Sequence, residues 1–176
     1  MDVYFLRHAN AGESLDDPKE DEKRPLDQSG IKQSQRVGRV LAGLEVKFDA
    51  IISSPLVRAK QTAALAAAEL GYTKSILMEK ALRPDGEFED FEQILRRHSK
   101  AESIMVVGHN PNLSEFLSLL VSDEENEKAI DLKKGALARL EWKPRRSQLH
   151  WILVPRLVQA VEETSATKSR PKTSRK

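Results

Sequence analysis

Short apolar runs alternate along the chain with longer segments in which apolar residues recur at helical spacing. Four of the short runs are rich in β-branched or aromatic residues, which favours strands. These runs are Val3–Leu6, Phe48–Ile52, Ser75–Met78 and Ser103–Val107. Two further strands are predicted near the end of the chain, Ala136–Trp142 and Gln148–Val154, joined by a Lys-Pro-Arg-Arg turn.

Helices are predicted between these strands. One helix has an apolar stripe running from Ile31 to Leu44, and a second, rich in alanine, begins at Pro55 and ends at Gly71. Two others cover Phe88–His98 and Asn112–Val121. Alternation of strands and helices predicts a three-layer α/β/α fold with a mostly parallel sheet, and the final hairpin makes the sheet mixed.

Composition and charge fit one domain with a distinct tail. The 176 residues are 39% hydrophobic and 32% charged, as in ordinary globular proteins. Five of the 29 Lys and Arg residues and none of the 27 acids fall in Thr164–Lys176, so the preceding part carries a net charge of −3. We therefore predict a folded domain over residues 1–158, a flexible basic tail over 159–176 and no nucleic-acid partner. The charged segment Glu13–Arg24 is predicted to be a loop.

Several classes of function are excluded by what the sequence lacks. It has no cysteine, which excludes disulfides, thiolate nucleophiles and thiolate zinc sites. No apolar stretch approaches the roughly 20 residues that span a bilayer. The first residues carry Asp2 and too short an apolar run for a secretory signal. We therefore expect a cytoplasmic protein that does not bind membranes.

Two histidines and two arginines stand at the ends of predicted strands. Arg7 and His8 follow the first strand, His109 follows the strand Ser103–Val107, and Arg58 lies just beyond a third strand, at the start of a helix. Because parallel strands end at the same edge of a sheet, these side chains should meet there. Any one of them alone would be interpreted as structural or solvated, but three strand ends carrying such residues favour a functional site.

A phosphoryl group suits this set of residues. Arginine offers planar donors that match phosphate oxygens, and a helix start adds backbone N–H groups. A neutral imidazole can act as a nucleophile, and a protonated one can donate a hydrogen bond to a phosphoryl oxygen. The acids at Asp16-Asp17 and Glu20–Glu22 are interpreted as a solvated loop rather than a metal site, because basic residues flank them. An alternative is that this loop borders the pocket and screens substrates.

Three segments carry a resemblance to a known family. Leu6–Ala9, Ser53–Ala63 and Val107–Pro111 resemble the signature segments of the histidine phosphatase superfamily, which also contains phosphoglycerate mutases. Chain length and the stretch Pro25–Gly30 make the sequence most similar to the SixA-type phosphohistidine phosphatases. The resemblance covers roughly residues 1–155 and implies a phosphoglycerate mutase-like fold.

The resemblance also implies roles for individual residues. His8 would take the phosphoryl group, Arg7, Arg58, His109 and Asn110 would surround it, and water would hydrolyse phospho-His8 without a metal or organic cofactor. Ala9 stands where most members have glycine. Larger members place a general-acid glutamate in the region of Leu82–Gly86, where this chain has a proline. Substitute acids are proposed from the neighbouring carboxylates, although a solvated carboxylate is the favoured interpretation of each: Glu79, Asp85 and Glu87.

Absence of that acid bears on the substrate. Expelling an alkoxide requires a proton donor, since its conjugate acid has a pKa near that of water, about 15.7. Imidazole leaves far more easily, because its protonated form has a pKa of roughly 6.5. The predicted function is therefore dephosphorylation of phosphohistidine on a protein, such as a histidine phosphotransfer domain, by a monomeric enzyme. The alternatives are a small-molecule phosphomonoesterase and a phosphate-binding module without turnover.

Overall fold

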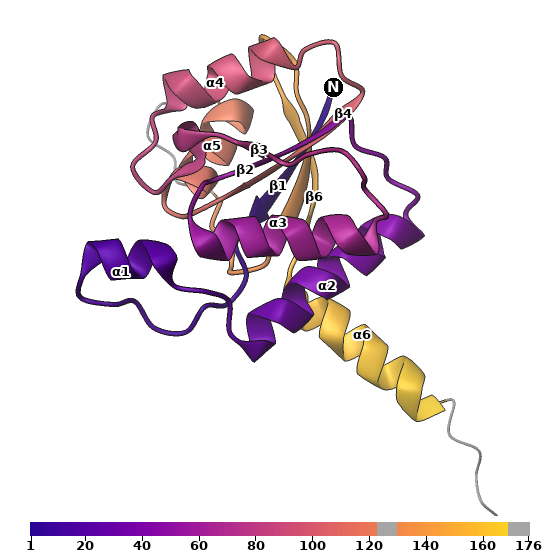
Figure 1. The fold of residues 1–176 in the computed structure, drawn as a ribbon. Coiled ribbons are helices and arrows are strands. Elements are labelled where there is room, and N and C mark those ends of the chain that lie inside the picture. Colours follow the sequence, from indigo (N-terminus) through magenta and orange to yellow (C-terminus); the bar gives the residue numbers. More distant parts are fainter. Residues whose placement is uncertain (123–129, 169–176) are drawn as a thin grey trace, which may run out of the picture.

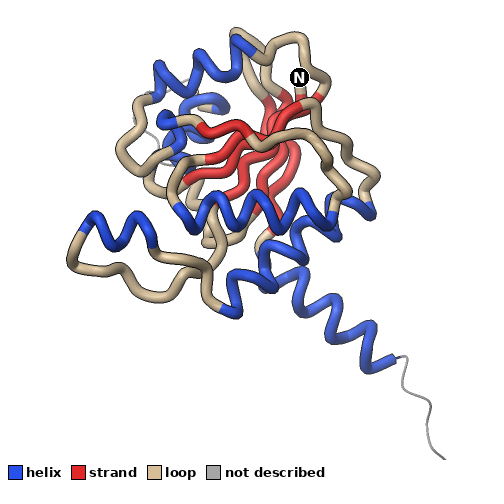
Figure 2. The backbone as a smooth tube through the Cα atoms, in the orientation of Figure 1, coloured by secondary structure: helices blue, strands red, loops and turns tan. Residues whose placement is uncertain are grey.

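A six-stranded sheet forms the centre of the molecule (Figures 1 and 2). The structure is a computed structural model, and it describes residues 1–122 and 130–168. Across the sheet the strand order is β3-β2-β4-β1-β5-β6. The strands are β1 (Asp2–Arg7), β2 (Ala50–Ser53), β3 (Leu77–Met78), β4 (Ser103–Gly108), β5 (Leu137–Glu141) and β6 (Gln148–Leu153). The first four run parallel, whereas β5 is antiparallel to both of its neighbours.

Helices cover both faces of this sheet. The described helices are α1 (Pro18–Lys23), α2 (Gln28–Gly43), α3 (Val57–Glu69), the 3-10 helix η1 (Lys80–Leu82), α4 (Phe88–Arg97), α5 (Asn112–Val121) and α6 (Pro155–Lys168). Buried residues of α4 and α5 pack on one face, and those of α2 and α3 pack on the other. The predicted three-layer α/β/α fold with a mostly parallel mixed sheet is confirmed. In the described part of the chain, no helix is both long and apolar enough to cross a membrane.

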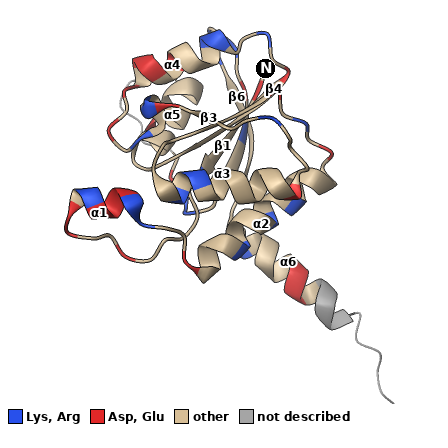
Figure 3. Ribbon diagram, in the orientation of Figure 1, with Lys and Arg blue, Asp and Glu red and all other residues tan. Residues whose placement is uncertain are grey.

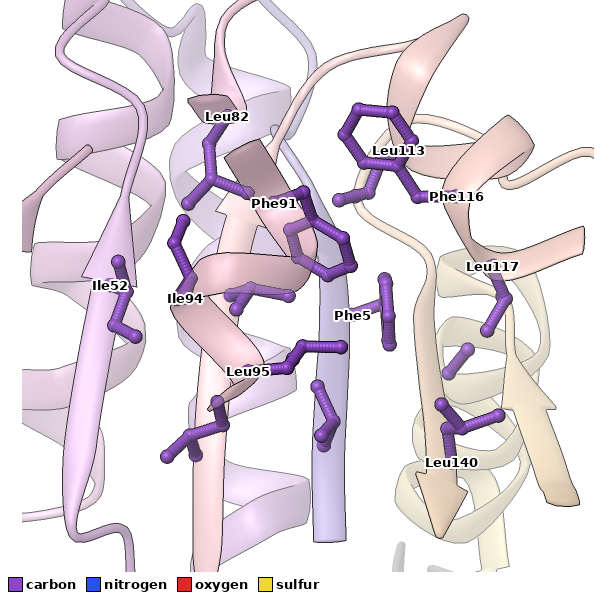
Figure 4. Packing of buried hydrophobic residues seen from close by; sticks show 14 of the residues in the cluster. Phe5, Ile52, Leu82, Phe91, Ile94, Leu95, Leu113, Phe116, Leu117 and Leu140 are labelled. Atoms are coloured by element: carbon purple, nitrogen blue, oxygen red, sulfur yellow. The ribbon is translucent and has the colours of Figure 1, made fainter. Parts of the chain in front are cut away.

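The apolar core beneath α4 and α5 is rich in aromatic side chains (Figure 4). Phe91 of α4 stacks on Phe116 of α5 with ring centroids 4.9 Å apart, and it also meets Phe5 of β1 at 5.6 Å. Leu113, Ile94 and other apolar residues complete the cluster. This core therefore fixes β1 and its neighbours from one side, while the alanine-rich face of α3 fits closely against the other.

Two segments differ from the sequence expectation. The predicted loop Glu13–Arg24 contains the short helix α1, which Asp17 caps by accepting a hydrogen bond from the Lys19 backbone N–H at 2.8 Å. An Asp-Pro pair is a favourable helix start, and the density of charges in this segment obscured it.

The second difference concerns the end of the chain. The predicted domain boundary at residue 158 falls inside α6, so residues 159–168 are helical rather than an irregular tail. Glu162 accepts a hydrogen bond from Arg36 of α2 at 2.7 Å and lies 3.5 Å from Arg39. The helical spacing of Leu157, Val158 and Val161 explains this helix. The polar composition of the segment led to the prediction of a tail instead. The rest of the predicted tail, 169–176, lies outside the described residues.

Candidate active site

The two strand-end histidines meet at the carboxyl edge of the sheet. β1 and β4 are neighbours in register, with Arg7 opposite Gly108, so the next residue of each strand is a histidine. A hydrogen bond of 2.9 Å from the His8 backbone N–H to the Gly108 carbonyl continues the pairing. The rings of His8 and His109 lie with centroids 4.9 Å apart, and both are buried.

Hydrogen bonds from other elements hold the loop after β1. The Ala9 backbone N–H donates to Thr62 Oγ1 of α3 at 3.0 Å, and the Gly135 N–H bonds to the carbonyls of both Arg7 and His8 at 3.1 Å. The start of α2 packs tightly on Asn10, because a side chain at Gly30 would collide with the Asn10 carbonyl. The stretch Pro25–Gly30 therefore supports the backbone that carries His8.

His8 is held as a neutral imidazole. Its Nδ1 lies 2.8 Å from the Ala9 carbonyl, a contact that requires the proton on Nδ1 and leaves Nε2 with a free lone pair. Burial, together with the charges of Arg58 and Arg7, lowers the pKa of His8 to about 3. At neutral pH this side chain has the protonation state of a nucleophile.

His109 contacts Ser54 across the site. Its Nε2 lies 2.9 Å from Ser54 Oγ, which also accepts a hydrogen bond from the Leu56 N–H at 3.3 Å. Burial lowers the pKa of His109 to about 2, and the nearby His8 and Arg58 contribute to the shift. Ser54 has a hydroxyl proton to give to Nε2, which leaves the proton of a neutral His109 on Nδ1.

The two predicted arginines border the histidines, and each is partly engaged with the chain. Arg7 donates to the Leu132 carbonyl at 2.7 Å, and Arg58 donates to the Asp21 carbonyl at 2.7 Å with the Asp21 carboxylate 3.2 Å away. Burial lowers the pKa of both guanidinium groups. Both nevertheless keep a positive charge at neutral pH.

Three nitrogens of this cluster are unsatisfied. Within the described residues, the buried side-chain atoms that lack any hydrogen-bond partner are Arg7 Nε, Arg58 Nε and His109 Nδ1. Buried donors are normally paired, and each unpaired one costs about 1–3 kcal/mol. All three come from one site with two cationic side chains, Arg58 buried and Arg7 partly buried, an arrangement that suits an anion.

The remaining predicted site residues lie around this cluster with their polar atoms engaged. Asn110 donates to the Leu132 carbonyl at 3.1 Å, the same oxygen that Arg7 uses, and its Oδ1 accepts from Ser114. Glu79 pairs with Arg97 at 2.7 Å, and Asp85 is exposed and pairs with Arg83 at 3.1 Å. Asn110 and Arg7 therefore share the Leu132 carbonyl as an acceptor, whereas neither carboxylate joins the group around His8.

Sequence reasoning missed three neighbours of the site: Ser54, Asp21 and Arg83. Ser54 lies within one of the signature segments, and its position at the end of β2 was a usable signal. Asp21 lies in the charged loop for which a position at the border of the pocket is the sequence alternative, and Arg83 lies in the segment that departs from the family pattern; neither residue is singled out by the sequence pattern. Among the described residues, no group of three or more His, Asp or Glu side chains could hold a metal ion.

Fold and site together define an α/β protein with a cationic, two-histidine site at the carboxyl edge of its sheet. The family model for the histidine phosphatase superfamily (branch 1) matches residues 3–85. An uncharacterised protein of Picosynechococcus is 35% identical over 153 residues, which cover 85% of this chain and 90% of that protein. The chain belongs to the histidine phosphatase superfamily.

Two other similarities concern SixA. Phosphohistidine phosphatase SixA of Escherichia coli is 28% identical over 127 residues, covering 70% of this chain and 76% of that protein. A solved structure of the protein histidine phosphatase SixA complexed with tungstate has a TM-score of 0.80 at 22% identity and covers 90% of this chain and 99% of that one. Similarity at that identity establishes a shared fold.

Proposed function

We propose that this protein is a phosphatase that transfers a phosphoryl group from its substrate to His8 and then to water. The preferred substrate is phosphohistidine on a protein. The observation that carries the proposal is the cluster of buried nitrogens of Arg7, Arg58 and His109, which find no partner in the described part of the chain, beside a neutral His8. Superfamily membership supports phosphatase activity.

In the first step the lone pair on His8 Nε2 attacks phosphorus. A P–N bond forms as the bond between phosphorus and the leaving group breaks, and the leaving group takes the electron pair. The guanidinium groups of Arg7 and Arg58, with the Nδ1–H of His109, stabilise the charge on the non-bridging oxygens. The hydrogen bond from His8 Nδ1 to the Ala9 carbonyl stabilises the positive charge that develops on the ring.

In the second step water attacks the phosphorus of phospho-His8. The P–N bond breaks, its electrons return to Nε2, and inorganic phosphate leaves with the oxygen of the water. The water's proton passes to phosphate or solvent, and His8 regains its neutral form. Negative charge on the bound phosphoryl group favours a protonated His109, which offsets the lowering of its pKa by burial.

Leaving-group chemistry supports phosphohistidine as the substrate. Ionised carboxylates cannot donate a proton, and the two acids beside Arg58, Asp21 and Glu22, are held ionised. Burial by itself raises the pKa of Asp21, but hydrogen bonds from the Leu15 N–H and from Arg24 lower it below its usual value. A hydrogen bond from Arg83 lowers the pKa of Glu22. Within residues 1–122 and 130–168, no acid that could donate a proton lies beside His8, which suits an imidazole leaving group because it needs far less assistance than an alkoxide.

The test compares three substrates: a phosphohistidine protein, an aryl phosphate and a sugar phosphate. We expect kcat/KM to fall in that order, with the sugar phosphate hydrolysed slowest, and His8→Ala to abolish all three activities. His150→Ala, which alters an exposed histidine of β6, is the matched control. Trapping the wild-type protein during turnover should give an acid-labile phosphoryl adduct that the His8→Ala variant lacks.

Two alternatives give different results in the same test. A small-molecule phosphomonoesterase would hydrolyse the sugar phosphate at least as fast as the phosphohistidine protein. A phosphate-binding module would bind inorganic phosphate but hydrolyse none of the three substrates.

A further inference from the structure

Helix α1 lies apart from the three layers of the fold, beside the first turn of α3 (Figures 1 and 2). None of its six residues is buried, so no apolar packing fixes it to the domain. Its links to the domain are polar and come from Asp21 and Glu22, on the side of the helix facing the site arginines. A helix held in this way is stabilised by charge pairs, whose strength depends on what else the partner arginines bind.

Asp21 forms an ion pair with Arg58, one of the two arginines that border His8. Its Oδ2 lies 3.2 Å from the Arg58 guanidinium, and its carbonyl accepts a hydrogen bond of 2.7 Å from the same Arg58 nitrogen. The side chains are only 6% and 19% exposed, so water screens this pair less than a surface pair. Arg58 is therefore both the partner of the Asp21 carboxylate and one of the cationic side chains beside His8.

Glu22 makes the second link, to Arg83. The Glu22 carboxylate lies 2.6 Å from the Arg83 guanidinium, which also contacts Asp85 at 3.1 Å. The charges of α1 are mixed, with basic and acidic residues side by side (Figure 3). Only these two carboxylates of α1, among the described ion pairs, reach arginines outside their own segment.

A phosphoryl group bound beside His8 and the Asp21 carboxylate would both bind the Arg58 guanidinium. Both are anions whose oxygens accept guanidinium hydrogen bonds, and two anions on one cation repel each other. Phosphoryl binding at His8 would therefore occur against the field of Asp21, or with α1 moved away.

We propose that Asp21 competes with the substrate's phosphoryl group for Arg58, so that α1 sets the affinity of the site for anions, with Glu22 holding α1 in place through Arg83. Phosphoryl binding then displaces the Asp21 carboxylate from Arg58. This inference rests on the phosphoryl site proposed above, but it concerns binding alone and needs no turnover.

The test measures binding of inorganic phosphate by calorimetry to the full chain and to three variants. Asp21→Asn keeps an oxygen that can accept from Leu15 and Arg24, and it removes both the charge and the acceptor atom that faces Arg58. Glu22→Gln removes the second link. Glu20→Gln is the matched control, because Glu20 lies on the same helix, is exposed and pairs with Lys23 of that helix.

Asp21→Asn should tighten phosphate binding about tenfold, as expected for losing one charged competitor. Glu22→Gln should tighten it by about two- to fivefold, and Glu20→Gln should leave it unchanged. A supporting role of Asp21 in positioning Arg58 predicts the opposite sign for Asp21→Asn.

Weaker or unchanged phosphate binding by Asp21→Asn would overturn the inference, as would equal tightening by Glu20→Gln or the absence of phosphate binding in all four proteins. Turnover is measured separately. A wild-type protein that binds phosphate but hydrolyses no substrate would contradict the proposed function and leave this inference standing.

Discussion

The apolar core under α4 and α5 and the polar edge around His8 both involve strand β1. They differ in how completely their buried groups find packing or hydrogen-bond partners. Phe5 of β1 is fully buried against Phe91, with aromatic contacts on that side. Arg7 ends the same strand and His8 follows it, at a site where three buried nitrogens have no partner among the described residues. Stability thus resides in the core, while the site holds unmet hydrogen-bonding capacity that lowers stability and suits an anion.

Replacing the nucleophile should show that the edge serves activity rather than folding. His8→Ala is expected to lower kcat/KM by about 10⁴-fold or more, because no other side chain can form the covalent intermediate. The thermal unfolding curve should remain cooperative. Residual turnover within tenfold of wild type would mean that His8 does not carry the phosphoryl group.

The opposite pattern is expected in the core. Phe91→Ala removes a buried ring that packs on both Phe116 and Phe5, and it should lower the free energy of unfolding by about 3–5 kcal/mol. Below its melting temperature the variant should keep kcat near the wild-type value. Leu44→Ala is a control at an exposed apolar residue, expected to change stability by less than about 0.5 kcal/mol. A large fall in kcat for the folded Phe91→Ala protein would show that core and site are coupled.

Acidification should destabilise the protein through the site. His8 and His109 have folded-state pKa values of about 3 and about 2, below the 6.5 of an unfolded histidine. Between those values and pH 6.5 the unfolded chain binds more protons, so stability falls as the pH is lowered. From pH 7 to pH 5 each histidine should contribute a loss of about 2 kcal/mol.

Urea denaturation at the two pH values measures that loss. Inorganic phosphate should reduce it, because the anion favours a protonated His109. If the wild type and His109→Ala lose the same stability over this range, burial of a neutral His109 is not the cause.

The smallest effect on activity is expected at Ser54, whose hydroxyl contacts His109. Ser54→Ala removes the hydroxyl that contacts His109 Nε2 at 2.9 Å, and kcat/KM should fall by about tenfold, the equivalent of one hydrogen bond. Ser54→Thr keeps the hydroxyl and should retain most of the activity. Equal losses for the two variants would point to packing rather than to the hydrogen bond.

The sequence predicted the fold class and the meeting of His8 and His109, for a definable reason. Parallel strands with clear apolar runs end at one edge, so residues placed just after them are brought together by the topology alone. Arg58 was placed by the same rule, since it lies in the first turn of α3.

Contacts made by loops were not predictable in this way. The link between Asp21 and Arg58 joins positions 37 apart, and Asp21 lies in a charged segment with no apolar periodicity. Likewise, the proximity of Asn110 to Arg7 in the fold does not reveal that its amide binds the Leu132 carbonyl. Such contacts depend on side-chain direction and on the path of the loop, neither of which the pattern of strands and helices encodes.

The position of β4 has a consequence for synthesis of the chain. β1 and β2 are not neighbours, because β4 lies between them and pairs with both. A nascent chain that has emerged from the ribosome only as far as residue 100 contains His8 and Arg58 but lacks the strand that joins their halves of the sheet. We therefore expect the cluster around His8 to assemble only after residues 103–108 have left the exit tunnel.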